Sequence, residues 1–238
     1  MRQSPVESQP ALRRLIGMVR SPRATLAAAI ARPRSLDLAL LTVTISTACS
    51  VSFLLTRAGQ LAALDQQVRQ LELLGTVVTD QLYARLRDWE RYRPLLSALG
   101  ISIGWPVLWI SGAAVITAIG NRTGRVQATF AQVLTVVVHA SSILALRAIV
   151  ALPVNYMRES LGGATSLAAM LPGLGDGSFA ARLFGAIDLF LVWVVLLAAL
   201  GLGMLYRTRA LTIARWVFGA YATGAAALAL TQALRGGL

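Results

Sequence analysis

The chain has 238 residues, of which 56% are hydrophobic and only 13% are charged, a composition too apolar for an ordinary soluble domain. Its formal net charge of +12 would suggest nucleic acid as the partner of a soluble protein. Here the arginines flank long apolar runs, so anionic lipid head groups are the expected partner and no nucleic acid is expected.

A basic leader, residues 1–35, precedes the first apolar run. It contains no segment typical of a cleavable signal peptide, because the first apolar run begins only near residue 36 and is too long for a signal h-region. Two interpretations of the leader stay open. It either lies along the anionic cytoplasmic surface of the membrane or is a frayed basic tail that only sets the topology. Its weak amphipathic pattern consists of Leu12, Leu15, Ile16 and Val19.

Five long apolar runs follow the leader. A hydrocarbon core about 30 Å thick is crossed by about 20 helical residues at a rise of ~1.5 Å each. Barrel strands would instead show short alternating segments, whereas these runs are apolar on all sides. The sequence therefore predicts one all-α, polytopic membrane domain over residues 36–238. Its five predicted transmembrane helices cover about residues 36–56, 94–119, 126–154, 183–206 and 216–234.

The hydrophilic segment 58–93 has apolar residues at helical spacing, interrupted at Gly75 and Arg85. A continuous helix of this length would reach about 50 Å, so we expect a bend at Gly75. The segment is either an external arm that binds a partner or forms a coiled coil, or a helical hairpin that rests on the outer membrane surface or on the bundle. The short and interrupted repeat favours the hairpin.

Glycines mark places where predicted spans could approach one another closely. Gly100 and Gly104 form such a step in the second span, and Gly201 lies on a similar smooth face of the fourth. These positions predict a packed bundle, which a scaffold and a transporter would both need.

Three polar residues inside the third and fourth spans are the main site candidates, because ionisable groups within a membrane have a functional role by default. Arg147 and Asp188 are predicted at equal depth on sequential antiparallel helices, so we expect a salt bridge between them. The bridge either locks the bundle or marks a polar cavity for a solute or proton. His139, near the middle of the third span, is expected to be a hydrogen-bonded packing residue rather than a ligand or proton carrier.

The arginines of the short loops predict the orientation. Two follow the second span and three follow the fourth, which places the N-terminus in the cytoplasm and the C-terminus outside. The chain has no lysine and many alanines, which favours a GC-rich bacterial genome. The expected location is therefore a bacterial inner (plasma) membrane, crossed several times.

Motifs of common enzymes are missing. The sequence has no His-Glu-x-x-His, no Gly-x-Ser-x-Gly and no phosphate-binding Gly-x-x-x-x-Gly-Lys. Asp37 and Asp188 are predicted at opposite membrane faces, so they cannot act as paired aspartates. The single histidine excludes a His-based metal site. We therefore expect no enzymatic activity, no catalytic residue, no cofactor and no metal.

The order of these features resembles the Yip domain family, five-span membrane proteins named for interaction with Ypt/Rab GTPases. The resemblance covers almost the whole chain, from Ser21-Pro-Arg-Ala-Thr25 through Phe130-Ala-Gln-Val133 to the fourth span. It is most specific in Ile187-Asp-Leu-Phe-Leu-Val-Trp193, where Asp188, Phe190 and Trp193 match Asp-x-Phe-x-x-Trp. Gly201 then matches the aliphatic-Gly step. Members often carry a proline after the Ala-Ser stretch of the third span, where this chain has Ile143 and Leu144.

The resemblance implies a non-enzymatic role, either in organising the membrane or in adapting a partner protein to it. A homo-oligomer or another membrane protein is then the expected partner. The alternative is a small-solute or ion transporter acting as an oligomer, with a polar site around Arg147, Asp188 and His139. A cavity that reaches these residues would favour transport, and a dry packed bundle would favour a scaffold.

Overall fold

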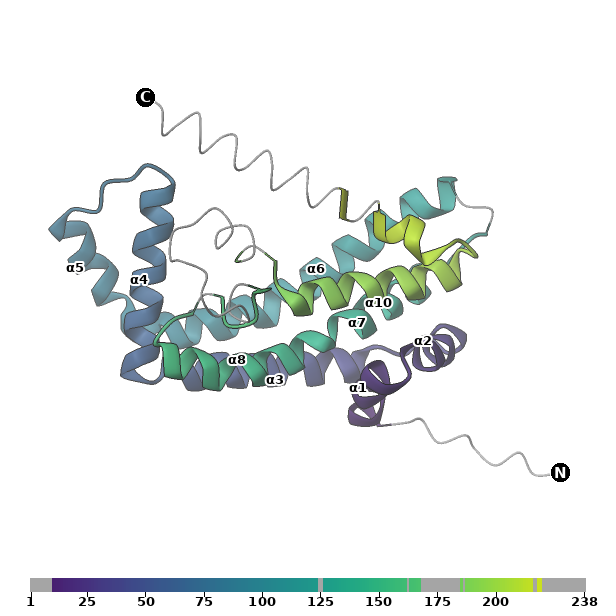
Figure 1. Cartoon of the computed structure of the whole chain (residues 1–238), viewed down its shortest axis with the longest axis horizontal. Helices are drawn as coiled ribbons and strands as arrows, with labels where there is room; N and C mark the ends of the chain where they lie inside the picture. The colour runs from purple at the N-terminus through teal and green to yellow at the C-terminus, as the bar shows by residue number, and fades with distance from the viewer. Residues whose placement is uncertain are drawn as a thin grey trace.

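The computed structural model describes residues 10–123, 126–161, 163–167, 185, 187–215 and 218–219. The regular elements that it defines in these ranges are helices (Figure 1), which agrees with the predicted all-α class. Three helical stretches are long and apolar enough to cross a membrane: Leu36–Leu54, Asp80–Arg122 and Phe130–Arg158. A shorter apolar helix covers Leu189–Leu205. The predicted fifth span, 216–234, lies almost entirely outside the described residues.

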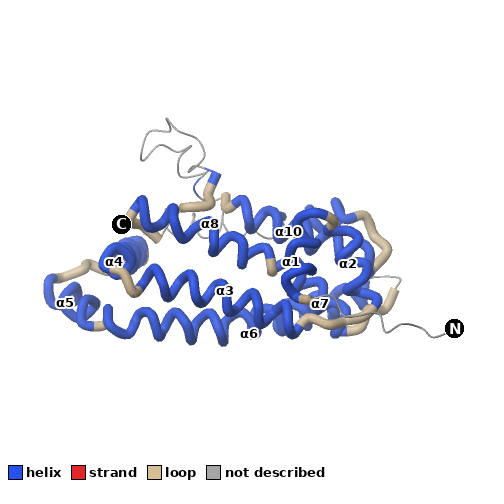
Figure 2. The backbone as a smooth tube through the Cα atoms, turned by 90° about the horizontal axis from the view of Figure 1, so that it is seen from below, coloured by secondary structure: helices blue, strands red, loops and turns tan. Residues whose placement is uncertain are grey.

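The first two predicted spans correspond to α3 (Leu36–Leu54) and α6 (Arg93–Thr123). With 19 residues, α3 reaches about 28 Å at ~1.5 Å per residue, close to the thickness of a hydrocarbon core. α3 and α6 pack side by side (Figure 2), and the Ser50 and Ser97 hydroxyls are hydrogen-bonded at 2.8 Å. The expected helix approach at Gly100 and Gly104 has no counterpart in the described part of the chain, where no atom lies within 4 Å of a Cβ added at either position.

The third predicted span consists of two helices, α7 (Phe130–Ser141) and α8 (Ile143–Arg158), interrupted at Ser142. Two serine hydroxyls bond to carbonyls of the preceding turn at this interruption. Ser141 Oγ donates to the Val137 carbonyl at 2.8 Å, and Ser142 Oγ donates to the His139 carbonyl at 2.7 Å. Such bonds back to the preceding turn compete with the helical ladder and bend helices.

The fourth apolar helix, α10 (Leu189–Leu205), is shorter than the predicted span 183–206. Asp188 is the N-cap residue of α10. The sequence interpretation, which places Asp188 inside the fourth span, is therefore wrong about this position. Asp188 Oδ1 accepts hydrogen bonds from the backbone N–H groups of Phe190 at 2.9 Å and Leu191 at 3.2 Å. Aspartate is a preferred N-cap because its carboxylate satisfies amide groups that the helix leaves unpaired.

The helices form two neighbouring packing groups along an elongated bundle. α3 packs between α6 and α8 in one group, and α7 packs between α6 and α10 in the other. The second group encloses a core cluster that contains Val133, Val136, Leu202 and Tyr206. Because α6 contacts both α3 and α7, it connects the two groups.

The leader forms α1 (Ala11–Arg20) and α2 (Pro22–Ala31). α2 packs against α7 and α10, whereas α1 packs mainly against α3 and makes smaller contacts with α7 and α8. Met18 and Leu26 are fully buried in a cluster with Ala140, Ile143 and Leu197. Arg14 forms an ion pair with Asp37 at the start of α3. It also donates a 2.7 Å hydrogen bond to the Arg34 carbonyl. Residues 11–31 are therefore folded helices of the bundle and not a frayed tail.

The hydrophilic segment forms α4 (Arg57–Leu73) and α5 (Asp80–Asp88), followed by the 3₁₀ turn η1 (Glu90–Tyr92). The predicted bend is confirmed, since Gly75 adopts a φ of 81° just after α4 ends. α4 packs against the ends of α3 and α8, and Ala62 and Leu64 are buried. We call α4 and α5 with their connection the α4–α5 arm. It lies at the end of the molecule opposite α2 (Figures 1 and 2).

Candidate functional site

The predicted ion pair between Arg147 and Asp188 is confirmed. Arg147 Nε on α8 lies 2.8 Å from Asp188 Oδ2 before α10. Thr165 completes the group, because its hydroxyl donates to Asp188 Oδ2 at 2.6 Å and accepts from Arg147 Nε at 3.1 Å. The three side chains fix α8, the following connection and the start of α10 to one another.

The backbone around Thr165 explains how it reaches the pair. Ser166 and Asp188 form an isolated antiparallel bridge. In this bridge the Leu167 N–H donates to the Ile187 carbonyl at 2.9 Å, and the Leu189 N–H donates to the Thr165 carbonyl at 3.1 Å. Sequence reasoning missed Thr165, because an isolated bridge has none of the periodicity by which longer strands are recognised.

The donors around Asp188 leave part of the Arg147 guanidinium unused. The Asp188 carboxylate receives two side-chain donors and two amide donors, and its side chain is only 15% exposed. The Arg147 side chain is 43% exposed, and the described residues supply no hydrogen-bond acceptor to its two terminal nitrogens. Arg147 can therefore bind a further anion while it stays paired with Asp188.

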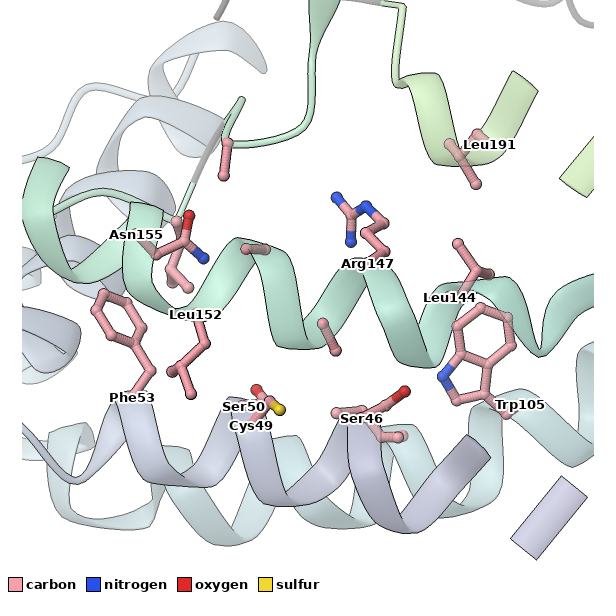
Figure 3. A pocket seen from close by; sticks show the side chains of 15 residues that line it. Ser46, Cys49, Ser50, Phe53, Trp105, Leu144, Arg147, Leu152, Asn155 and Leu191 are labelled. Carbon is pink, nitrogen blue, oxygen red and sulfur yellow. The ribbon is translucent and has the colours of Figure 1, made fainter. Parts of the chain in front are cut away.

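Arg147 lines a pocket of about 380 Å³ between α3, α6 and α8. Figure 3 shows side chains of α3 on one side of this view and Arg147 and Leu191 on the other, with α8 between them. The lining residues repeat every three or four positions, so each helix contributes one face. They are Ser46, Cys49, Ser50 and Phe53 on α3, Ile101 and Trp105 on α6, and Leu144, Arg147, Ala148, Ala151, Leu152 and Asn155 on α8, joined by Leu161, Ala164 and Leu191.

Two buried polar atoms of this pocket have no partner among the described residues. Ser46 is 8% exposed and its Oγ has no hydrogen-bond partner in the described ranges. The same holds for Asn155 Oδ1, two turns of α8 beyond Arg147. Since buried polar groups are normally hydrogen-bonded, such atoms indicate where a ligand or water binds. Neither residue was singled out from the sequence, because a serine in the middle of a span and an asparagine at a span end give no distinctive signal.

His139 does not belong to this pocket. It is fully buried on α7, and its Nδ1 donates to the Thr135 carbonyl one turn earlier at 2.8 Å. Its Nε2 has no partner within the described ranges. The structure thus joins Arg147 and Asp188 but places His139 in the packed interior, as expected for a packing histidine.

The remaining candidates, Phe190, Trp193 and Gly201, lie on α10 and serve packing. The rings of Phe190 and Trp193 lie 6.2 Å apart between centroids, and both pack against the cluster that holds Met18 and Leu26. A Cβ added at Gly201 would lie 2.6 Å from Val136 Cγ1 and 3.3 Å from Leu26 Cδ2. Gly201 therefore permits the close approach of α10 to α7 and α2.

The described residues contain no group of three or more His, Cys, Asp or Glu side chains placed to hold a metal ion. The chemistry available at the pocket is ionic and hydrogen-bonding recognition by Arg147, Ser46 and Asn155, next to apolar walls. Comparison of the chain with protein-family models, with curated proteins and with solved structures found no match.

Proposed function

We propose that this chain is a non-enzymatic, multi-pass protein of a bacterial inner membrane, similar to Yip domain proteins, that adapts a partner protein to the membrane or organises the membrane itself. In this proposal the N-terminus is cytoplasmic and the C-terminus is outside. The packed helices and the fixed α4–α5 arm support it.

The observation that carries the proposal is the shape and surface of the α4–α5 arm. Its base is anchored, since Arg93 donates a 3.1 Å hydrogen bond to Gln67 Oε1 and Ala62 and Leu64 are buried. Its turn presents apolar side chains to the surroundings, with Val77 81% exposed. An anchored projection with exposed apolar residues is typical of a surface that contacts another protein.

In-cell photocrosslinking tests this function. A benzophenone amino acid placed at Val77 should give a discrete protein adduct that mass spectrometry identifies, either a membrane-protein partner or a second copy of this chain. Leu40, exposed on the membrane-crossing helix α3, is the control position and should give no adduct of that size. Equal adducts at both positions, or none at Val77, would contradict a role of the arm in partner binding.

The transporter alternative has one specific observation in its favour, the pocket that reaches Arg147. This pocket includes neither His139 nor Asp188 among its lining residues, so in the described part of the chain it does not join the three candidates. Proteoliposomes on a solid-supported membrane would test transport through the current evoked by small carboxylates or phosphates. A current that is lost in Arg147→Lys supports a transporter, and no current together with a Val77 adduct supports the adaptor.

A further inference from the structure

We propose that the pocket between α3, α6 and α8 binds one anionic phospholipid, with Arg147 contacting the phosphate and the apolar walls contacting an acyl chain. This inference goes beyond the proposed function, because an adaptor and a transporter could each hold such a lipid. It rests on the charge at Arg147, on the unpartnered Ser46 and on the apolar remainder of the pocket.

The charge argument begins with Asp188, which does not consume the whole positive charge of Arg147. Thr165 and two amide groups at the N-terminus of α10 also donate to Asp188. That helix end carries a partial positive charge of its own. Asp188 is therefore stabilised by donors other than Arg147 as well, and among the described residues no acceptor is hydrogen-bonded to the terminal nitrogens of Arg147. A guanidinium edge with two N–H donors matches a phosphate in a bidentate arrangement.

The unpartnered polar atoms supply a second, independent indication of a ligand. Ser46 is more than nine-tenths buried, lines the pocket and has an Oγ without a hydrogen-bond partner in the described structure. Figure 3 shows Ser46 on α3, Arg147 on the other side of α8 at a similar level along that helix, and Asn155 further along α8. A ligand that contacts both Ser46 and Arg147 would therefore extend across α8. Hydroxyl and amide groups of this kind bind the ester and head-group oxygens or hydroxyls of a lipid.

The apolar walls select a lipid over a free anion. Phe53, Ile101, Trp105, Leu144 and Leu152 line the pocket. These side chains offer no hydrogen-bonding partner to inorganic phosphate apart from the Trp105 indole, but they match an acyl chain in polarity and can pack against it. The three helices belong to stretches that are long and apolar enough to cross a membrane, so the pocket lies where lipid is the surrounding solvent. Its volume of about 380 Å³ lies near the lower end of the range of small-ligand sites, so the pocket would hold only part of the lipid and the rest would lie in the surrounding bilayer.

The test uses the full-length protein, delipidated in detergent, with phosphatidylglycerol or phosphatidylcholine of identical acyl chains as the probe. Native mass spectrometry should show one phosphatidylglycerol retained and phosphatidylcholine bound about tenfold more weakly. Both lipids carry the phosphate, but the choline ammonium of phosphatidylcholine cancels the negative charge and would lie close to the Arg147 guanidinium. Phosphatidylglycerol should also slow the modification of Cys49, which lines the pocket, by a methanethiosulfonate reagent. Inorganic phosphate should not slow that reaction.

Two variants locate the site. Ser46→Leu fills the pocket and should weaken phosphatidylglycerol binding about tenfold, whereas Ser52→Leu, at an exposed position of the same helix, should leave it unchanged. Arg147→Lys keeps a cation for Asp188 but loses the second donor edge, so it should bind the lipid more weakly while its melting temperature changes little. If Ser46→Leu fails to fold, two measurements still test the proposal: the comparison of the two lipids on the unmodified chain, and the binding of phosphatidylglycerol to Arg147→Lys.

Several results would overturn the inference. Equal binding of the two lipids would show that the pocket does not select a net negative head group and would overturn the assignment of an anionic lipid. Equal effects of Ser46→Leu and Ser52→Leu would place the lipid elsewhere. Protection of Cys49 by inorganic phosphate alone would identify a soluble anion as the ligand. None of these results bears on the Val77 crosslink, so the lipid site and the adaptor role can fail separately.

Discussion

Replacing Asp188 by asparagine should destabilise the protein because it removes the counter-charge of Arg147 but keeps the helix cap. The asparagine oxygen can still accept from the Phe190 and Leu191 amides, so the cap survives. What is lost is the charged acceptor of Arg147 Nε at 2.8 Å and of the Thr165 hydroxyl at 2.6 Å. Hydrogen bonds to charged groups are worth about 1.5–3 kcal/mol, but Arg147 is 43% exposed and solvent screens the pair. We therefore expect Asp188→Asn to lower the free energy of unfolding by about 1–2 kcal/mol.

Asp188→Ala removes the cap as well and should cost about 1 kcal/mol more. The decisive measurement is a double-mutant cycle in one detergent, with Asp188→Asn, Arg147→Gln and the double variant followed by thermal unfolding. For a chain of this size, 1 kcal/mol corresponds to a shift of roughly 2–4 °C. The decrease in melting temperature of the double variant should be smaller than the sum of the decreases of the two single variants, because each single change leaves one charge without its partner. Strictly additive losses would refute the reasoning and show that the contact does not stabilise the bundle.

Three further predictions concern packing and topology. Gly201→Ala should lose about 1–3 kcal/mol by overpacking against Val136, since its Cβ would lie 2.6 Å from Val136 Cγ1. Gly104→Ala, where nothing lies within 4 Å, should be neutral or stabilising in the same thermal assay. Met18→Ala should lower the free energy of unfolding by about 2–5 kcal/mol because Met18 is fully buried. Val19→Ala, at its exposed neighbour, should change stability little. Equal losses of stability in the two variants would place the leader outside the core. Reporter fusions should give alkaline phosphatase activity at Leu71, Gly173 and Leu238 but none at Met1, Asn121 and Arg209, and activity at Asn121 would reverse the orientation.

The sequence predicted the Arg147–Asp188 pair because membrane depth follows from residue counting along helices of known rise. The same counting assumed that the fourth helix begins near residue 183. It therefore could not show that Asp188 caps α10, since capping depends on where the backbone leaves the extended conformation. The pocket was missed for a related reason, because Ser46 and Asn155 come from helices whose relative rotation is set by packing and not by hydropathy.

The leader shows a different limit of sequence reasoning. Its amphipathic pattern predicted an apolar face but not the surface that covers it. The structure divides that face, since Leu15 and Met18 are buried in the bundle while Leu12, Ile16 and Val19 remain exposed. Periodicity measures how apolar residues are distributed around one helix, and it carries no information about a partner helix more than a hundred residues away.

The docking of the leader also has a consequence for the order in which the chain is assembled. Met18 packs in one cluster with Leu197, so its complete binding surface exists only after about 180 further residues have been synthesised. At ~5–20 residues per second this takes roughly 10–35 s. During that interval α1 and α2 have apolar side chains and arginines, but the helices that cover them in the folded protein have not yet been made. The surface of the bilayer can accommodate the apolar side chains and the arginines of these two helices. The earliest helices of the chain are thus among the last to reach their final neighbours, and a slowly translating ribosome would lengthen their stay at the lipid surface.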